Sequence, residues 1–220
     1  MLSSIQPATA VELAQLRRQL TGRGRDIANE RVLRAMERVP RHAFVPAHLR
    51  AEAYDDRPLP IGFDQTISQP FIVAFMTAAI DPQPGDRVLE VGTGCGYQTA
   101  VLAELAGEVY SIEIVESLAR RATETLARLG CRNAHVRHGD GWHGWPEHSP
   151  FDAILVTCSP GLIPSALIDQ LRPGGRMIIP IGSLHAGQEL WLIEKTTDGI
   201  HRDAVLPVRF VPMTGQAETL

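Results

Sequence analysis

Residues 87–97 read RVLEVGTGCGY, and this stretch decides the fold of the chain. The apolar run Arg87–Val91 is typical of a buried strand, and it carries an acid, Glu90, next to its last residue. Three alternating glycines follow it: Gly92, Gly94 and Gly96. A helix is predicted over Tyr97–Ala106, because apolar residues recur four positions apart from Tyr97 onward. Glycines at such a turn let a ligand approach the bare backbone, and the N-terminus of the helix directs N–H groups toward that ligand.

The order of the glycines indicates the kind of ligand. They follow the pattern G-x-G-x-G, whereas the dinucleotide fingerprint G-x-G-x-x-G needs a glycine where Tyr97 stands. Glu90 suits a ligand with a positive charge better than it suits a pyrophosphate. The pattern therefore favours S-adenosylmethionine, which carries an ammonium and a sulfonium, over NAD. A glycine-rich structural turn without a ligand is the alternative at this point.

Strands and helices alternate on both sides of this stretch. Strands are predicted over Arg87–Val91, Glu108–Ile112, Ala134–His138, Phe151–Thr157 and Arg176–Ile181, and helices over Tyr97–Ala106, Val115–Leu129 and Pro164–Leu171. From Glu189 the pattern changes to strand, Asp198-Gly199 turn and strand, which is typical of an antiparallel hairpin. The sequence thus predicts an α/β fold: a Rossmann-like doubly wound sheet, mostly parallel, with an antiparallel C-terminal edge.

An N-terminal helical segment precedes this core. Helices are predicted over Val11–Leu20, Asp26–Arg38 and Phe71–Ile80, with a proline-rich irregular stretch before the last of them. We expect a single domain over residues 1–220, in which 1–80 supplies helices and a loop, 81–188 the core and 189–220 the hairpin. The loop that ends at Gln65–Pro70 is a candidate site, because loops often carry function. The alternative for Ser68 is a plain N-cap of the following helix.

The bulk composition excludes several classes of protein. The 220 residues are 44% hydrophobic and 21% charged, and the net charge of −4 lacks the footprint of a nucleic-acid-binding protein. Three cysteines without a C-x-x-C pair indicate neither a disulfide framework nor a zinc ribbon, and no metal site is expected. The sequence shows no export signal and no apolar run near the ~20 residues that span a bilayer. We expect a cytoplasmic protein with no nucleic-acid or membrane partner.

Two further acids stand at predicted strand ends. Glu113 closes the second core strand, where an acid can accept both ribose hydroxyls of a nucleoside. Asp140 follows the third strand in a Gly-Asp-Gly run and can accept a hydrogen bond from an adenine amino group. Taken singly, Glu113 reads as a surface carboxylate and Asp140 as part of an Asp-Gly turn. Three successive strands that each deliver an acid beside the glycines predict a site for S-adenosylmethionine.

The glycine motif resembles motif I of the class I methyltransferases, and the chain as a whole resembles the protein-L-isoaspartate O-methyltransferases. The matching segments lie within about residues 25–215 and are RVPRH (38–42), FVP (44–46), PLPIG (58–62), QTISQP (65–70), LEVGTGCGY (89–97), VYSIE (109–113), HGDG (138–141), FDAI (151–154), PGGR (173–176) and VRFVPMTG (208–215). The block Thr66–Ser68 is the most specific, because other class I methyltransferases lack it.

This resemblance implies methyl transfer from S-adenosylmethionine to the free α-carboxylate of an L-isoaspartyl residue in a damaged protein, leading to repair through a succinimide. The carboxylate is ionised at neutral pH, so no general base is needed. The enzyme must hold its oxygen in line with the methyl group and exclude water. Ser68 is the predicted catalytic residue, which orients the carboxylate through its hydroxyl. The expected cofactor-binding residues are Thr66, Ile67, Gln69, Glu90, Gly92, Thr93, Gly94, Gly96, Glu113, Ile114, Asp140, Gly141 and Thr214.

Recognition of an isoaspartyl residue has to read the main chain, because that residue differs from aspartate by one backbone methylene and a misplaced carboxylate. The predicted reading elements are the loop over Leu59–Gln69 and an edge strand over Pro207–Thr214, which can pair with an extended peptide. Isoaspartyl-containing proteins and peptides are the expected partners, and a monomer is expected.

The sequence departs from the pattern of this family at two places. Cys158-Ser159-Pro160 stands where a small, alanine-rich segment is usual, and Asp64 stands where glycine is more common. Cys158 is alternatively a small apolar filler. The departures leave open a related carboxyl methyltransferase that acts on a dedicated peptide or small acid. A nucleic-acid methyltransferase is disfavoured, since no Asn/Asp-Pro-Pro-aromatic motif follows the fourth core strand. A non-catalytic binding protein on the same fold would need a blocked cofactor site.

Overall fold

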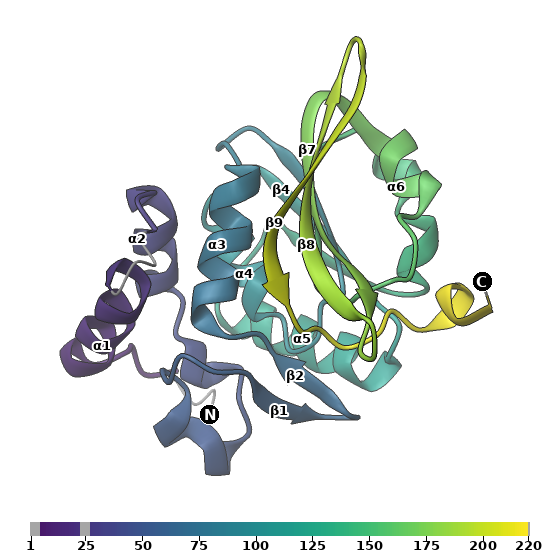
Figure 1. The fold of residues 1–220 in the computed structure, drawn as a ribbon. Helices are drawn as coiled ribbons and strands as arrows, with labels where there is room; N and C mark the ends of the chain where they lie inside the picture. The colour runs from purple at the N-terminus through teal and green to yellow at the C-terminus, as the bar shows by residue number, and fades with distance from the viewer. Residues whose placement is uncertain (1–4, 23–26, 220) are drawn as a thin grey trace.

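The structure is a computed structural model that describes residues 5–22 and 27–219. Within these residues, a central sheet orders its strands as β5-β4-β3-β6-β7-β8-β9 (Figure 1). The strands are β3 (Arg87–Val91), β4 (Glu108–Glu113), β5 (Ala134–His138), β6 (Phe151–Val156), β7 (Leu171–Ser183), β8 (Gly187–Thr196) and β9 (Gly199–Val208). Pairing is parallel from β5 to β7 and antiparallel from β7 to β9. The predicted Rossmann-like sheet with an antiparallel C-terminal edge is confirmed.

Helices cover both faces of this sheet. They are α3 (Pro70–Ile80), α4 (Tyr97–Ala103), α5 (Glu116–Arg128) and α6 (Ser165–Gln170). Successive residues of β3 point to opposite faces. Val88 packs with residues of α3 and α4 on one face, whereas Leu89 and Val91 pack with Leu167 of α6 on the other. The chain runs from β3 to β4 on one side and reaches β6 on the other, so the carboxyl end of β3 is the switch point where α/β sheets bind ligands.

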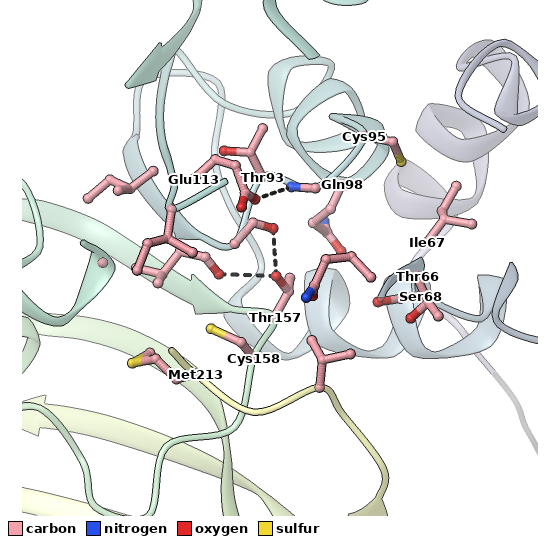
Figure 2. Close-up of a pocket in the computed structure, with 18 of the residues that line it drawn as sticks. Thr66, Ile67, Ser68, Thr93, Cys95, Gln98, Glu113, Thr157, Cys158 and Met213 are labelled. Carbon is pink, nitrogen blue, oxygen red and sulfur yellow. Dashed lines mark hydrogen bonds between the residues drawn. The ribbon is translucent and has the colours of Figure 1, made fainter. Parts of the chain in front are cut away.

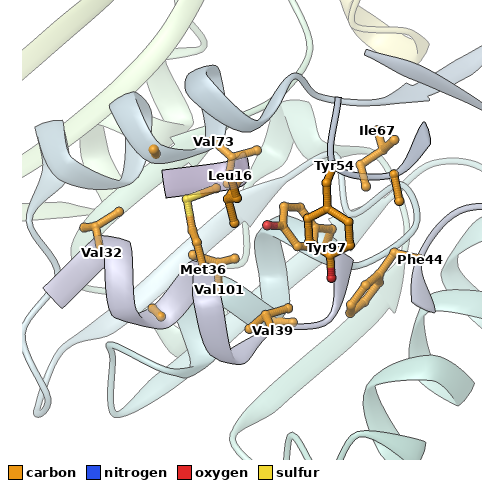
Figure 3. Close-up of a cluster of buried hydrophobic side chains, with 14 of the residues drawn as sticks. Leu16, Val32, Met36, Val39, Phe44, Tyr54, Ile67, Val73, Tyr97 and Val101 are labelled. Atoms are coloured by element: carbon orange, nitrogen blue, oxygen red, sulfur yellow. The ribbon is translucent and has the colours of Figure 1, made fainter. Parts of the chain in front are cut away.

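The N-terminal helices α1 (Ala10–Thr21) and α2 (Glu30–Arg38) pack against α3 on its side away from the sheet (Figures 1 and 3). Leu16, Met36 and Val73 meet there in one buried cluster. The predicted helix over 26–38 begins later than expected, because the Asn29 side chain accepts the backbone N–H groups of Arg31 and Val32 and caps α2. Asp26 lies outside the described residues. Two short 3₁₀ turns follow, Arg41–Ala43 and Ala47–Glu52.

The stretch predicted to be irregular before Pro70 contains a β-hairpin. Strand β1 (Leu59–Gly62) pairs antiparallel with β2 (Gln65–Ile67), and Phe63 and Asp64 form the turn, each with a φ of 56°. Positive φ at both central residues is the geometry of the tight hairpin turn that favours Asn-Gly or Asp-Gly. Phe-Asp carries no such signal, and for this reason the sequence does not announce the hairpin.

The C-terminal edge differs from the prediction. Strand β9 ends at Val208, so the expected edge strand over Pro207–Thr214 is wrong beyond that residue. Beyond Val208, the backbone of Phe210 bonds to the Gln188 side chain instead of to a strand. Phe210 donates its N–H to the Gln188 Oε1 (2.6 Å), and the Gln188 Nε2 donates to the Phe210 carbonyl (3.2 Å). The other short 3₁₀ elements are Gly141–His143, Pro146–His148 and Gly215–Thr219.

Several boundaries of the core shift by a few residues. Helix α4 ends at Ala103 rather than Ala106, and β8 begins at Gly187 rather than Glu189. The predicted turn over 172–175 lies inside β7 as an irregularity between its pairings with Phe151 and Ala153. No helix among the described residues is long and apolar enough to cross a membrane.

Candidate active site

A cavity opens at the carboxyl ends of β3, β4 and β6 (Figure 2). It encloses about 790 Å³, including the part that is open to solvent. Three segments far apart in the sequence wall it: residues 65–68 after the hairpin, residues 91–98 except Gly96, and residues 211–214 after β9. The remaining lining residues are Val73, Ile112, Glu113, Ile114, Gly141, Thr157 and Cys158. The predicted residues Thr66, Ile67, Ser68, Gly92, Thr93, Gly94, Glu113, Ile114, Gly141 and Thr214 therefore meet at one place.

Gly92 allows the ends of β3 and β6 to approach each other closely. Its φ is 96°, and its carbonyl accepts a hydrogen bond from the Thr157 Oγ1 at 2.6 Å. A Cβ at this position would lie 2.3 Å from that same oxygen. Gly96 serves the packing of helices instead, since it is the left-handed residue before α4, and a Cβ there would press on Ala122 of α5 at 3.3 Å. Gly92 thus shapes the cavity, whereas Gly96 lies outside its lining and lets two helices pack.

Glu113 ties the end of β4 to the glycine loop, residues 92–96. Its side chain is almost completely buried. One carboxylate oxygen accepts the N–H of Gly94 at 2.7 Å, and the other accepts the N–H of Val115 at 2.9 Å. Each oxygen keeps a lone pair for a further donor, because a carboxylate has about four acceptor positions. The two backbone bonds fix the carboxylate at the cavity wall.

Glu90 lies beneath the glycine loop and does not line the cavity. Its side chain has no exposed surface, and its Oε2 accepts hydrogen bonds from the hydroxyls of Thr99 (2.5 Å) and Ser111 (2.7 Å). The Ser111 hydroxyl also contacts the Thr93 Oγ1 at 2.5 Å, which connects the acid to the loop above it. Burial raises the pKa of Glu90 to about 8, although the two hydroxyls work in the opposite direction. The protonated form is thus favoured near neutral pH.

Asp140 also lies outside the cavity lining. One carboxylate oxygen accepts the N–H of Trp142 (2.9 Å), as in an Asp-Gly turn, and the other accepts the N–H of Gln216 (2.8 Å). The neighbouring Gly141 lines the cavity, and a Cβ there would lie 2.3 Å from a methyl group of Val91. Asp140 therefore holds the C-terminal turn against this wall, while Gly141 keeps the wall flat.

Ser68 stands where the cavity meets a second groove. The groove encloses about 990 Å³ including open solvent, and shares Thr66, Ser68, Thr157 and Val211 with the cavity. Its other lining residues are Pro58, Gln69, Ile72, Pro207, Val208, Arg209 and Phe210. Ser68 does not cap α3: the cap position is Gln69, which makes no side-chain capping bond. The N-cap interpretation of Ser68 is wrong, and Gln69 belongs to the groove rather than to the cavity.

The C-terminal arm, residues 209–214, forms a wall of both spaces. Two hydrogen bonds between the Gln188 side chain and the Phe210 backbone, called here the Gln188 clasp, hold one end of the arm. Ser159 holds the other end: it donates its N–H to the Val211 carbonyl (2.8 Å), and its carbonyl accepts the N–H of Met213 (2.9 Å). The Ser159 hydroxyl donates to the Gly182 carbonyl at 3.0 Å. Ser159, part of the unusual Cys158-Ser159-Pro160 segment after β6, therefore anchors the arm.

The sequence matches the family described as protein-L-isoaspartate(D-aspartate) O-methyltransferase over residues 13–218. The chain belongs to this family. A protein-L-isoaspartate O-methyltransferase of Gloeobacter violaceus is 55% identical over 192 residues, which cover 87% of this chain and 94% of the relative. Protein-L-isoaspartate O-methyltransferase 2 of Syntrophobacter fumaroxidans is 58% identical over 193 residues, or 87% and 78% of the two chains.

Solved structures agree with this assignment to the protein-L-isoaspartate O-methyltransferases. One structure named protein-L-isoaspartate O-methyltransferase has a TM-score of 0.83 at 28% identity, and the match covers 94% of this chain and 66% of that one. A Plasmodium falciparum protein assigned to the same enzyme, in complex with S-adenosyl-L-homocysteine, gives a TM-score of 0.80 at 28% identity over 92% and 98% of the chains.

The cavity of this methyltransferase fits S-adenosylmethionine. Gly94 has a φ of 56°, and a Cβ there would come into contact with a methyl group of Ile61 at 3.4 Å, so the glycine keeps this part of the cavity wall free of a side chain. Glu113 offers an anchored carboxylate with free lone pairs, and the loop carries no bulky side chain between Gly92 and Gly94 that would fill the space. These residues can receive a nucleoside with a positively charged tail.

Sequence reasoning missed part of this lining. Thr157, Gln98 and Met213 face the cavity, and their residue types gave no signal. Cys158 stands out in the sequence only as a departure from the family; it lines the cavity, and burial raises the pKa of its thiol well above the usual range. The signal that could have found Thr157 and Cys158 is their place at the carboxyl end of a core strand, because ligands bind at the carboxyl ends of such strands.

Proposed function

We propose that this protein transfers a methyl group from S-adenosylmethionine to the free α-carboxylate of L-isoaspartyl residues in damaged proteins, and so starts their repair through a succinimide. The observation that carries the proposal is the junction at Ser68. There the cavity suited to the cofactor meets a groove of about 990 Å³, including open solvent, and Thr66, Ser68, Thr157 and Val211 belong to both spaces. Membership of the isoaspartate methyltransferase family supports the same reaction.

Several cavity residues would hold the cofactor. Glu113 would accept the ribose hydroxyls through the lone pairs that its two backbone bonds leave free. The glycine loop would take the amino-acid part, with Thr93 and Gly94 at the wall, and Gly141 and Thr214 would border the adenine. Thr66 and Ile67 would cover it from the hairpin side. Three predicted residues would support the site without contacting the cofactor. Glu90 would fix the glycine loop, Gly96 the helix α4 and Asp140 the C-terminal turn.

The chemistry asks for positioning more than for proton transfer. When bound, S-adenosylmethionine supplies an electrophilic methyl group. The substrate carboxylate is already ionised at neutral pH, so no side chain has to remove a proton. Ser68 donates its hydroxyl to one carboxylate oxygen and thereby aims the other toward the cavity. Ile67, Val211 and Met213 supply apolar surface that keeps water from the reacting atoms.

The groove suits main-chain recognition of a peptide. Among the described residues, neither the N–H nor the carbonyl of Arg209 forms a backbone hydrogen bond, although Phe210 beside it is fully paired. Because neighbouring residues of an extended segment face opposite ways, Arg209 presents these groups away from Gln188. An extended peptide could pair with them as an added strand.

We extend the proposal to the organisation of the protein. Residues 1–220 act as one methyltransferase domain, because the cavity takes its walls from the N-terminal segment, the core and the C-terminal arm. The enzyme works as a cytoplasmic monomer on isoaspartyl proteins and peptides, without nucleic-acid or membrane partners.

A related carboxyl methyltransferase that acts on a dedicated peptide or small acid is the second candidate. The observation that favours it is Cys158, which stands in the cavity wall where the family usually has a small alanine-rich segment. A changed wall beside the reaction site alters which carboxylic acid fits. The distinction lies in the substrate and leaves the methyl transfer itself unchanged.

The decisive assay compares two peptides that differ only in an isoaspartyl or aspartyl linkage. With labelled S-adenosylmethionine, we expect a base-labile methyl ester on the isoaspartyl peptide alone. Label on neither peptide, in a protein that binds S-adenosylhomocysteine by calorimetry, would reject the substrate and favour the second candidate. No binding of S-adenosylhomocysteine would leave only a non-catalytic binding protein.

A variant tests the role of Ser68. Ser68→Ala should lower kcat on the isoaspartyl peptide by about 100-fold, since misplacement of a reacting group costs roughly that much. The dissociation constant for S-adenosylhomocysteine should stay unchanged. Ser165→Ala, at the first residue of α6, is the control and should keep full activity. Full methyl transfer by Ser68→Ala would remove Ser68 from the mechanism.

A further inference from the structure

The N-terminus of α3 is capped by a residue far from it in sequence. The Asp56 Oδ1 accepts the backbone N–H of Phe71 at 3.0 Å, across 15 residues of sequence. The Asp56 Oδ2 accepts a hydrogen bond from the Gln69 Nε2 at 2.9 Å. A carboxylate at this position also interacts favourably with the dipole of the helix. Asp56 therefore fixes the start of α3 at two points.

These two points bracket the chain just beyond Ser68. Gln69 follows Ser68 directly, and Phe71 is three residues after it. A serine that caps a helix accepts the N–H of the third residue after it, so the Phe71 N–H is the group that a capping Ser68 would bind. Asp56 occupies that N–H instead. The Ser68 hydroxyl makes no hydrogen bond to another described residue and lines both the cavity and the groove.

We propose that Asp56 is a positioning residue for methyl transfer, which holds Gln69 and Phe71 so that the Ser68 hydroxyl faces the substrate carboxylate instead of capping α3. This inference rests on the proposed function. When the Asp56 carboxylate is removed, the Phe71 N–H loses that acceptor, and Ser68 is the residue of the right type and spacing to replace it. The helix then keeps a cap, and the reaction loses its orienting hydroxyl.

The first test is kinetic. Asp56→Ala should lower kcat on an isoaspartyl peptide at least 10-fold and leave the dissociation constant for S-adenosylhomocysteine within twofold of the wild type. Asp56→Asn keeps an acceptor for the Phe71 N–H, and the Gln69 amide can rotate to offer its oxygen to the new NH₂ group, so this conservative variant should keep most of the activity. A kcat within twofold of the wild type in Asp56→Ala would overturn the proposal.

Asn29→Ala is the matched control. Asn29 caps α2 through the N–H groups of Arg31 and Val32 and, like Asp56, makes a second side-chain contact, with Asp81 at 3.0 Å. Its loss should lower the urea midpoint at least as much as Asp56→Ala, because Ser68 can take over the cap of α3 in the Asp56 variant, and it should leave kcat unchanged. An equal loss of kcat in both variants would mean that Asp56 acts through stability alone, and would reject the positioning role.

A second test follows the competition for the Phe71 N–H without any activity measurement. Asp56→Ala should lower the urea midpoint less in the wild-type background, where Ser68 can take over the cap, than in the Ser68→Ala background. Equal shifts in both backgrounds would reject the competition. Failure of the proposed function is distinguishable, because the wild-type protein would then methylate no isoaspartyl peptide whatever the effect of Asp56.

Discussion

The two sides of the active site are built in different ways. The glycine loop takes its shape from neighbours in sequence and in the parallel sheet: the β3 strand before it, α4 after it and the adjoining ends of β4 and β6. The wall opposite combines the segment around Ser68 with the C-terminal arm. Both are held in place by side chains that are remote in sequence: Asp56 binds the start of α3, and Gln188 binds Phe210.

This difference separates the part that binds a common cofactor from the part that selects a substrate. A strand, a glycine turn and a helix form wherever the local pattern is present, so one short motif can encode the cofactor side. The substrate side forms only when segments remote in sequence come together and side-chain hydrogen bonds hold them in place. Substitutions of Asp56 or Gln188 should therefore alter the peptide groove, whereas substitutions in the glycine loop should abolish cofactor binding.

The largest effect is expected for Gly92→Ala. The added Cβ would lie 2.3 Å from the Thr157 Oγ1, at a φ of 96° that alanine rarely adopts. S-adenosylhomocysteine binding should weaken by about 100-fold or more, which corresponds to about 3 kcal/mol. Calorimetry measures this directly. Gly85→Ala, where a Cβ meets nothing within 4 Å, is the control. Unchanged affinity in Gly92→Ala would show that the loop tolerates rearrangement and is not set locally.

Gln188→Leu probes the remote clasp of the arm. The change leaves the N–H and the carbonyl of the buried Phe210 without partners, which costs about 2–4 kcal/mol of the free energy of unfolding. The KM for an isoaspartyl peptide should rise, because the arm walls the groove. Urea unfolding and peptide kinetics check the two effects. Gln188→Glu, which keeps an acceptor for the Phe210 N–H, should lie in between; if it is as damaging as leucine, the clasp does not work through these bonds.

Glu90→Gln tests the buried acid beneath the glycine loop through the pH dependence of the free energy of unfolding. Burial raises the pKa of Glu90 from 4.5 to about 8, so the folded protein holds a proton that the unfolded chain has already released. Between pH 4.5 and pH 8 this group makes stability fall as pH rises, by about 1.4 kcal/mol per pH unit. The neutral glutamine removes that contribution. Urea unfolding at about pH 5.5 and about pH 7.5 should show a gain over the wild type that grows with pH; a constant difference would place the carboxylate in its ordinary ionised state.

Asp64→Gly should give the smallest effect, on the hairpin of the substrate side. Asp64 adopts a φ of 56°, where glycine meets no steric penalty, so the change should stabilise the protein by about 1 kcal/mol. Thermal unfolding measures the gain. Asp198→Gly, in the turn between β8 and β9 where φ is not positive, is the control and should give none. Equal responses of the two turns would contradict the strain assigned to the first hairpin.

Much of the fold was predictable because its signals are local. The strands and helices of the core follow from apolar periodicity, and the glycines with Glu113 point to the cofactor edge. The hairpin over Leu59–Ile67 was missed, because Phe63-Asp64 lacks the usual turn residues. The end of β9 was missed as well, because a glutamine side chain takes the place of a strand partner. Ser68 was placed in the site by resemblance, and its alternative as an N-cap failed for a reason that only Asp56 reveals.

The sequence by itself determined the parallel core, the glycine turn after β3 and the family to which the chain belongs, since each depends on short-range patterns of residue type. Only the tertiary structure decided that Glu90 and Asp140 support the cavity from outside, while Thr157 and Met213 line it. It also decided which residue caps α3 and what holds the C-terminal arm. The physical reason is the same in each case: a side chain faces a cavity or leaves it according to hydrogen bonds with residues tens of positions away.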